Sequence, residues 1–176
     1  MLLYIHVPFC STRCRYCAFH SSPLGRGVDA ASSPAVRDYV DTLFLELAHW
    51  GDQLGGSEVQ SVFFGGGTPS LLSPRIIGLT MERINKYFKL APKAEVTLEA
   101  NPESLRGGHR AAQYLDVGIN RLSIGVQSMD EGMLRLLGRP HKAQDSLHVA
   151  FLAREAGCAN INLDLMWGLP GQSVRQ

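Results

Sequence analysis

The sequence of 176 residues predicts an α/β fold built on a parallel sheet. Short apolar runs rich in β-branched and aromatic residues alternate with longer stretches whose apolar residues have helical spacing. Most of the apolar runs end at Gly, Pro or Asn, which stop a strand. Strands that alternate with helices form βαβ units, whose strands are parallel and whose crossovers are right-handed. No linker divides the chain, so we expect a single domain over residues 1–176.

The first half of the chain contains two strand–helix units. A strand is predicted at residues 2–8 (LLYIHVP), and the stretch 21–34, rich in Gly, Ser, Pro and Asp, is predicted to be a loop. The apolar stripe in AVRDYVDTLFLELAHW predicts a helix over residues 35–50. A buried strand is predicted at residues 59–64, followed by three glycines and by a helix from residue 74 to about residue 88.

The second half repeats this alternation. Strands are predicted at residues 94–100 (AEVTLEA) and 119–126 (INRLSIGV), with a helix at 108–117 between them. Helical segments are then expected at residues 131–137 and 144–156. Each helix is long enough to cross over one face of a sheet and return the chain to the next parallel strand.

The last predicted strand, residues 160–168, is followed only by LPGQSVRQ, which is too short for a covering helix. Parallel sheets normally bury both faces. We therefore expect that the chain is a fragment of a longer protein whose C-terminal part is missing here, with the sheet left incomplete.

Composition excludes several classes of protein. A formal net charge of +1 without a basic run gives no electrostatic footprint for nucleic acid. No apolar run approaches the ~20 residues of a transmembrane helix. The N-terminus lacks the charged region and long apolar segment of a signal peptide. Because clustered cysteines without export signals suit a reducing compartment, we expect a cytoplasmic protein.

Polar residues follow the predicted strands at the edge where parallel sheets bind ligands. Gly65–Gly67 end the second strand, and we expect this turn to leave backbone N–H groups free to donate to a ligand. Glu99 ends the third strand, Gln127 ends the fourth, and Asp164 lies in the last. The sequence therefore predicts a polar cofactor site at this edge.

Three of the four cysteines, Cys10, Cys14 and Cys17, lie within eight consecutive residues, in the loop that follows the first predicted strand at the same edge. Three thiols so close in sequence do not pair among themselves, so a metal is expected. Alone, the triplet fits a structural zinc ion, with His6 or His20 as fourth ligand, as well as a [4Fe–4S] cluster with one open iron. The polar edge beside it favours the open cluster, because an open coordination position is typical of a site that does chemistry.

The motif CSTRCRYC, with spacing Cys-x3-Cys-x2-Cys, resembles that of the radical S-adenosylmethionine (SAM) superfamily. The segments YIHVPFC, FFGGGTPS, LEANPE, RLSIGVQS and NLDLMWGLPGQ, one per predicted strand, resemble the oxygen-independent coproporphyrinogen III oxidase family. These segments extend from Tyr4 to Gln172. The resemblance implies that the fold is the N-terminal part of a parallel partial (β/α) barrel of the radical SAM type, truncated after the fifth strand.

The resemblance also implies roles for particular residues. The three cysteines would hold the [4Fe–4S] cluster, whose open iron binds SAM and whose electron, supplied by a protein such as a flavodoxin or ferredoxin, cleaves it to a 5′-deoxyadenosyl radical. Residues that match positions at the primary SAM molecule are Tyr4, Gly66 and Glu99. Residues that match positions at a second SAM molecule are Tyr16, Gly67, Thr68, Gln127, Arg139 and Asp164.

One position separates two branches of the family. The oxidases that decarboxylate coproporphyrinogen III have a further cysteine two residues after the third, and this chain has Phe19 there. The pattern resembles the heme chaperone branch, whose heme-binding motif belongs to a later part of the chain. The sequence therefore predicts a heme chaperone that binds SAM and a cluster, and heme in the full-length protein. The oxidase is the alternative, and a structural zinc-binding module is a distant third.

Overall fold

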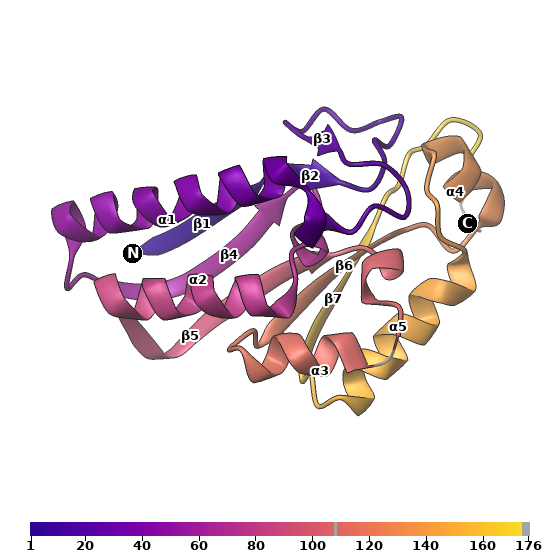
Figure 1. Ribbon diagram of the computed structural model, residues 1–176. Helices are drawn as coiled ribbons and strands as arrows, with labels where there is room; N and C mark the ends of the chain where they lie inside the picture. The colour runs from indigo at the N-terminus through magenta and orange to yellow at the C-terminus, as the bar shows by residue number, and fades with distance from the viewer. Residues whose placement is uncertain (108, 174–176) are drawn as a thin grey trace.

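The computed structural model describes residues 1–107 and 109–173, and it contains one parallel sheet of five strands (Figure 1). In spatial order the strands follow the chain: β1-β4-β5-β6-β7, and each neighbouring pair is parallel. This confirms the predicted α/β architecture and its strand order. The bounds of the five strands are β1 Leu2–Val7, β4 Glu58–Gly66, β5 Lys89–Ala100, β6 Arg121–Gln127 and β7 Asn160–Leu165.

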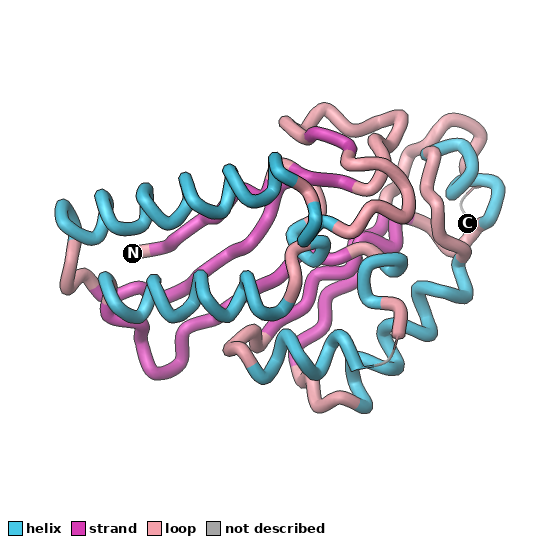
Figure 2. The backbone as a smooth tube through the Cα atoms, viewed as in Figure 1, coloured by secondary structure: helices cyan, strands magenta, loops and turns pink. Residues whose placement is uncertain are grey.

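Four of the five α-helices of the described chain lie over one face of this sheet (Figure 2). The long helices α1 and α2 run side by side over the β1 end, and α3 and α5 contact each other towards the β7 end. The short helix α4 lies near the C-terminus, beyond the carboxyl ends of the strands. Their bounds are α1 Pro34–Leu54, α2 Pro74–Tyr87, α3 His109–Asp116, α4 Glu131–Leu137 and α5 Ala143–Glu155. Gly108, where the third helix was predicted to begin, lies outside the described residues.

Local sequence explains where these helices begin and end. Pro34 and Pro74 occupy first-turn positions, where the missing N–H has no helical partner to lose. Asp130 caps α4 by accepting a hydrogen bond from the Met133 N–H at 2.9 Å. Gly138 ends the same helix in the left-handed conformation, with φ of 74°.

The strand register gives the sheet two different faces. The face under the helices is apolar and buried, as at Leu98 and Ile124, which are both 0% exposed. Burying such a side chain stabilises the fold by about 1.5–3 kcal/mol. Residues on the opposite face alternate with these along each strand. We call this opposite face, away from the helices, the inner face. On β5, β6 and β7 it is mostly polar, with Glu95, Thr97, Glu99, Arg121, Ser123, Asn160, Asn162 and Asp164.

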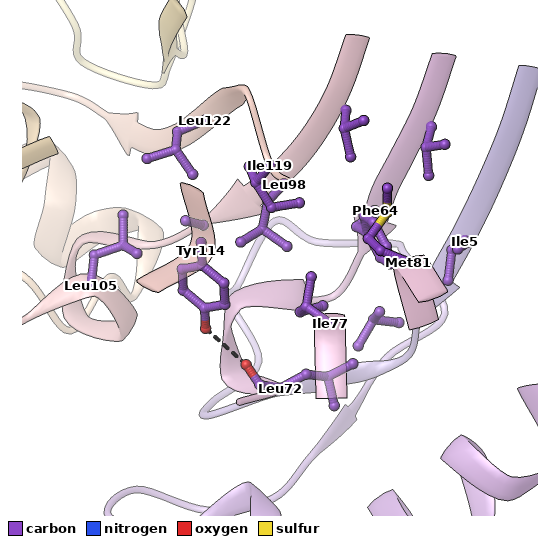
Figure 3. Close-up of a cluster of buried hydrophobic side chains, with 14 of the residues drawn as sticks. Ile5, Phe64, Leu72, Ile77, Met81, Leu98, Leu105, Tyr114, Ile119 and Leu122 are labelled. Carbon is purple, nitrogen blue, oxygen red and sulfur yellow. Dashed lines mark hydrogen bonds between the residues drawn. The ribbon is translucent and has the colours of Figure 1, made fainter. Parts of the chain in front are cut away.

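Tyr114 anchors the turn after β4 to the core (Figure 3). Its side chain is fully buried, and its hydroxyl lies 2.8 Å from the carbonyl oxygens of both Ser70 and Leu72. Burial raises the pKa of this phenol. The contact fixes η2 (Pro69–Leu71), a 3₁₀ helix that continues from the glycine-rich end of β4.

Several short elements were not predicted. The stretch expected to be a loop contains β3 (Ser22–Pro23), which pairs with β2 (Phe9–Cys10), and the 3₁₀ helix η1 (Ala30–Ser32). Another 3₁₀ helix, η3 (Pro102–Leu105), follows β5. These elements are only two to four residues long, too short for a period of apolar residues to show in the sequence. Among the described residues, no helix is both long enough and apolar enough to span a bilayer.

Candidate functional site

A pocket of ≈ 390 Å³ lies at the carboxyl edge of the sheet, under the cysteine loop. It forms from the loops that follow β1, β4, β5 and β6 and from the end of β7, so the ligand edge predicted for a parallel sheet is where the pocket is found. The predicted site residues that line it are Cys10, Cys14, Cys17, Tyr16, Gly66, Gly67, Thr68, Glu99, Gln127, Arg139 and Asp164.

The cysteine loop is held by backbone hydrogen bonds at both of its ends and at its middle. The Ser22 N–H donates to the Pro8 carbonyl at 2.7 Å, and the Leu24 N–H donates to the Cys10 carbonyl at 2.8 Å. The Arg15 N–H donates to the Leu137 carbonyl, at the end of α4, at 3.1 Å. The sheet edge and α4 therefore place the three cysteines over the pocket.

The donor set of three thiols fits the three cysteine ligands of an iron–sulfur cluster with one open iron. All three cysteines of the motif are free thiols, half-buried, and on one pocket. Within residues 1–107 and 109–173, no three His, Cys, Asp or Glu side chains converge as the ligands of one ion do. His6, a candidate fourth zinc ligand, instead lies with its Nε2 atom 2.9 Å from the His20 carbonyl oxygen. Thiolates around a cubane cluster bind separate irons and so lie further apart than the ligands of one zinc ion.

Two cysteine sulfurs already have hydrogen-bond donors from distant loops. The Thr68 hydroxyl lies 3.7 Å from Cys10 Sγ, and Arg139 Nη1 lies 3.4 Å from Cys14 Sγ. Tyr16 packs beside them. Burial raises the pKa of Tyr16 to about 12, the Arg139 cation lowers it, and Cys14 and Cys17 add to the increase. Tyr16 is therefore a neutral hydrogen-bonding phenol at physiological pH.

The glycine turn corrects one expectation, because its N–H groups are not free. The Gly66 N–H donates to Glu99 Oε2 at 3.1 Å, the Gly67 N–H to the Val7 carbonyl at 2.8 Å, and the Thr68 N–H to the Phe9 carbonyl at 2.6 Å. The prediction of free donors was wrong because the turn lies directly against the end of β1 and the start of the cysteine loop.

Close packing explains why glycines stand here. Gly66 has φ of 110°, a conformation that favours glycine. A Cβ atom at Gly67 would collide with the Phe9 carbonyl and lie 3.0 Å from Cys10 Sγ. What this turn offers a ligand is therefore close approach to the backbone and not free N–H donors.

Two carboxylates face the pocket, Glu99 from β5 and Asp164 from β7, the two strands that flank β6. Burial raises the pKa of Glu99, as does the nearby charge of Asp164, while the Gly66 N–H and His6 lower it. Asp164 is fixed by Ser123 Oγ at 3.2 Å and by Asn162 Nδ2 at 2.6 Å. Both carboxylates keep acceptor capacity for a ligand because each oxygen has two lone pairs.

Gln127 combines a strained backbone with a pocket position. It ends β6 with φ of 67°, the one positive φ outside glycine in the described part of the chain. Such a conformation costs of order 1–3 kcal/mol and persists where the surrounding structure imposes it, often at ligand sites. The register of β6 against β7 shifts between Gly125 and Gln127, which turns the Gln127 side chain to the pocket.

Tyr4 is the predicted site residue that does not line the cysteine pocket. It lies on β1, half-exposed, with its ring stacked 6.0 Å from Phe63 and its hydroxyl 3.3 Å from His6 Nδ1. Glu99 is nevertheless close: a Cβ at Gly65 would lie 2.9 Å from the Tyr4 ring and 3.1 Å from Glu99 Oε2. Tyr4 thus borders the site across Gly65.

Sequence reasoning missed Asn101, which lines the pocket beside Arg139. In the sequence this residue stands before a proline and was interpreted only as the end of a strand. The available signal was its polar side chain, which comes directly after the third predicted strand at the edge where the other polar residues gather.

Comparisons with known proteins agree with this geometry. The family model described as the radical SAM superfamily matches residues 4–176. Radical S-adenosyl methionine domain-containing protein 1, mitochondrial, of Bos taurus is 43% identical over 98% of this chain and 37% of its own length. Heme chaperone HemW of Escherichia coli is 41% identical over 99% of this chain and 44% of its own length.

A solved structure matches as well. Coproporphyrinogen III oxidase (HemN) of Escherichia coli, described as a radical SAM enzyme, superposes with a TM-score of 0.84 and 30% identity. The match covers 97% of this chain and 38% of that one. The chain thus spans less than half the length of these relatives. Its parallel sheet, its cysteine motif and a family match over nearly its whole length lead to one assignment: the chain belongs to the radical SAM superfamily.

Proposed function

We propose that this chain is the cluster- and SAM-binding core domain, residues 1–176, of a heme chaperone. The observation that carries this proposal is Phe19, which stands where the related oxidases have a further cysteine. Phe19 lines the cysteine pocket and is 64% exposed, so no thiol from this position faces the cluster site. The 41% identity to heme chaperone HemW over 99% of the chain supports the same branch.

In this proposal Cys10, Cys14 and Cys17 hold a [4Fe–4S] cluster. Together with SAM, such a cluster supplies one-electron reductive cleavage of a carbon–sulfur bond. The chain's own contribution is to hold, orient and shield. Thr68 and Arg139 donate hydrogen bonds to two of the cysteine sulfurs, and the loop contacts with α4 keep the thiols on one pocket.

The pocket residues provide complementary groups for a SAM molecule. Glu99 and Asp164 accept hydrogen bonds from an ammonium or from ribose hydroxyls. The Gln127 amide both donates and accepts. The pocket volume of ≈ 390 Å³ falls within the range of about 300–1,000 Å³ for small-molecule sites.

The partners and the compartment follow from the same site. Reduction of the cluster requires an electron donor, and the exposed loop around the cysteines suits docking of a flavodoxin or a ferredoxin. Free thiols on a redox site require a reducing compartment. A cytoplasmic location stays a prediction, and the Bos taurus relative is named as mitochondrial.

The alternative function is oxidative decarboxylation of coproporphyrinogen III. The TM-score of 0.84 to the solved oxidase supports it, and so do the residues in this pocket that match second-SAM positions: Tyr16, Gly67, Thr68, Gln127, Arg139 and Asp164. A structural zinc module is the weakest alternative, because the described cysteines do not converge on one point.

The test uses the full-length protein, purified without oxygen. Iron and sulfide near four per chain are expected for the cluster, whereas stoichiometric zinc without sulfide would exclude it. We then expect heme binding, and no loss of carboxyl groups from coproporphyrinogen III in the presence of reductant and SAM. Protoporphyrinogen formation that Cys10→Ala abolishes would instead establish the oxidase.

A further inference from the structure

Asn101 links the two residues that donate hydrogen bonds to Cys10 and Cys14 in the cysteine loop. It follows β5 and begins η3, where the Ser104 hydroxyl lies 3.1 Å from its backbone nitrogen. Its side-chain Nδ2 donates to Thr68 Oγ1 at 2.9 Å, and its Oδ1 accepts from Arg139 Nη2 at 2.5 Å. Thr68 and Arg139 are the two residues that donate to Cys10 Sγ and Cys14 Sγ. One amide therefore contacts both sulfur donors.

The chemistry of the amide fixes the direction of these hydrogen bonds. A hydroxyl has one proton, so a Thr68 Oγ1 that accepts from Asn101 keeps its proton for Cys10. The guanidinium is a rigid planar fork. With Nη2 held by Asn101 and by the Gly125 carbonyl at 2.7 Å, Nη1 is directed at Cys14.

We propose that Asn101 is a positioning residue of the iron–sulfur site, which sets the hydrogen bonds to Cys10 and Cys14 and thereby raises the reduction potential of the cluster. This inference rests on the proposed cluster. Donors to a thiolate sulfur stabilise the added negative charge of the reduced state, and so shift the potential upward. Outer-shell partners of this kind also orient the ligands themselves.

Asn101 is suited to this role where its charged isostere is not. An aspartate at this position keeps the contact to Arg139 but has no donor for Thr68. The Thr68 hydroxyl then turns its proton to the carboxylate, and Cys10 loses its donor. Alanine removes both contacts at once. Asn101→Asp therefore tests the hydrogen bond to Cys10 alone, and Asn101→Ala tests the hydrogen bonds to Cys10 and Cys14 together.

The experiment measures the midpoint potential by a redox titration followed through the EPR signal of the reduced cluster, without SAM, on anaerobically purified full-length protein. Iron and sulfide content of the wild type comes first, so that a missing cluster, which contradicts the proposed function, is distinguished from a failure of this inference. We expect a more negative potential for Asn101→Ala. Arg106→Met alters the exposed end of the same segment, where Arg106 pairs with Asp145, and serves as the matched control, with the wild-type potential.

A double-mutant cycle with Thr68→Val tests the pathway. The shift caused by Asn101→Ala should be smaller in the Thr68→Val background, because one of the two hydrogen bonds is already gone. An unchanged potential in Asn101→Ala, or a shift of equal size in both backgrounds, overturns the inference. If Asn101→Ala loses its fold by circular dichroism, Asn101→Asp takes its place in the cycle with the same criterion. A folded Asn101→Ala that takes up no cluster, beside a loaded Arg106→Met, supports positioning.

Discussion

The Nη1 atom of Arg139 lies 3.4 Å from Cys14 Sγ, although the two residues are 125 positions apart in the chain. Arg139 follows α4, and the same guanidinium holds Asn101 and the Gly125 carbonyl. The cysteine loop near the N-terminus is therefore held by a residue that comes after four of the five strands of the main sheet in the chain. This arrangement makes the site sensitive to substitutions far from the cysteines.

Replacement of Arg139 should lower both the free energy of unfolding and the iron content of the protein. Arg139→Met leaves the Gly125 carbonyl and Asn101 Oδ1 without their donor, and a buried acceptor left in this way costs about 1–3 kcal/mol. We expect a decrease of that size in the free energy of unfolding, measured with denaturant, and a lower iron content. Arg135→Met on the exposed side of α4 is the control and should retain both.

Gly67 is expected to be intolerant of even one methyl group. A Cβ atom there meets the Phe9 carbonyl and Cys10 Sγ, so Gly67→Ala must displace the cysteine loop. Iron and sulfide content after anaerobic purification should fall well below that of the wild type. Gly27→Asn, with φ of 74° and open space around it, tests whether substitution of any glycine near the loop has this effect. Full iron content in Gly67→Ala would contradict the packing argument.

Replacement of Gln127 by glycine should raise the free energy of unfolding and lower the affinity for SAM. Gln127→Gly relieves the φ of 67°, so we expect the free energy of unfolding to rise by about 1 kcal/mol while SAM affinity falls. Gln127→Ala also removes the amide but keeps a Cβ in the left-handed region. It should lose affinity without a comparable gain in stability. Denaturation curves and equilibrium dialysis of SAM distinguish the two variants.

The pKa of Glu99 predicts a particular dependence of stability on pH. Because burial raises this pKa, the folded state holds a proton that the unfolded state has released when the pH is between the two values. The free energy of unfolding therefore falls as the pH rises through this window above 4.5. Glu99→Gln should flatten this decrease and be more stable than the wild type at pH 7, while its SAM binding is weakened.

Glu103 should behave in the opposite way, which makes it the matched comparison. Burial raises the pKa of Glu103, but the His141 ring, whose Nδ1 lies 3.6 Å from Oε2, a backbone N–H and the Arg139 cation together lower it by more, so the net shift is downward. Its contribution to stability is present above the ordinary pKa of a glutamate and is lost as the pH falls through the folded value. Glu103→Gln should therefore be less stable than the wild type at neutral pH. Equal pH profiles of the two variants would contradict both assignments.

The repeating elements were predictable because their signals are local. The apolar stripe of α1 and the apolar run of β6 can each be recognised within one short segment of consecutive residues. The order of the parallel strands then follows from the right-handed crossover rule. The cysteines and the polar residues at the strand ends were found in the same way, since chain position alone places them at one edge.

What could not be predicted depends on contacts between distant residues. Whether the glycine N–H groups are free is decided by the approach of Val7 and Phe9, about sixty residues earlier. The role of Asn101 appears only when Thr68 and Arg139 are brought to its two ends. Tyr4 lies beyond the pocket lining because the side chain on β1 points to Phe63, which no sequence period reveals.

The difference between the two faces of the sheet affects how such a protein can evolve. Closed barrels fill their interior with branched apolar side chains, so nearly every strand residue carries part of the stability. Here Leu98 and Ile124 do that on the helix-covered face, while positions such as Thr97, Arg121 and Asn160 alternate with them on the inner face. A lineage can therefore exchange every second strand residue to accept a new substrate without endangering the core, so one folding unit can serve many chemistries.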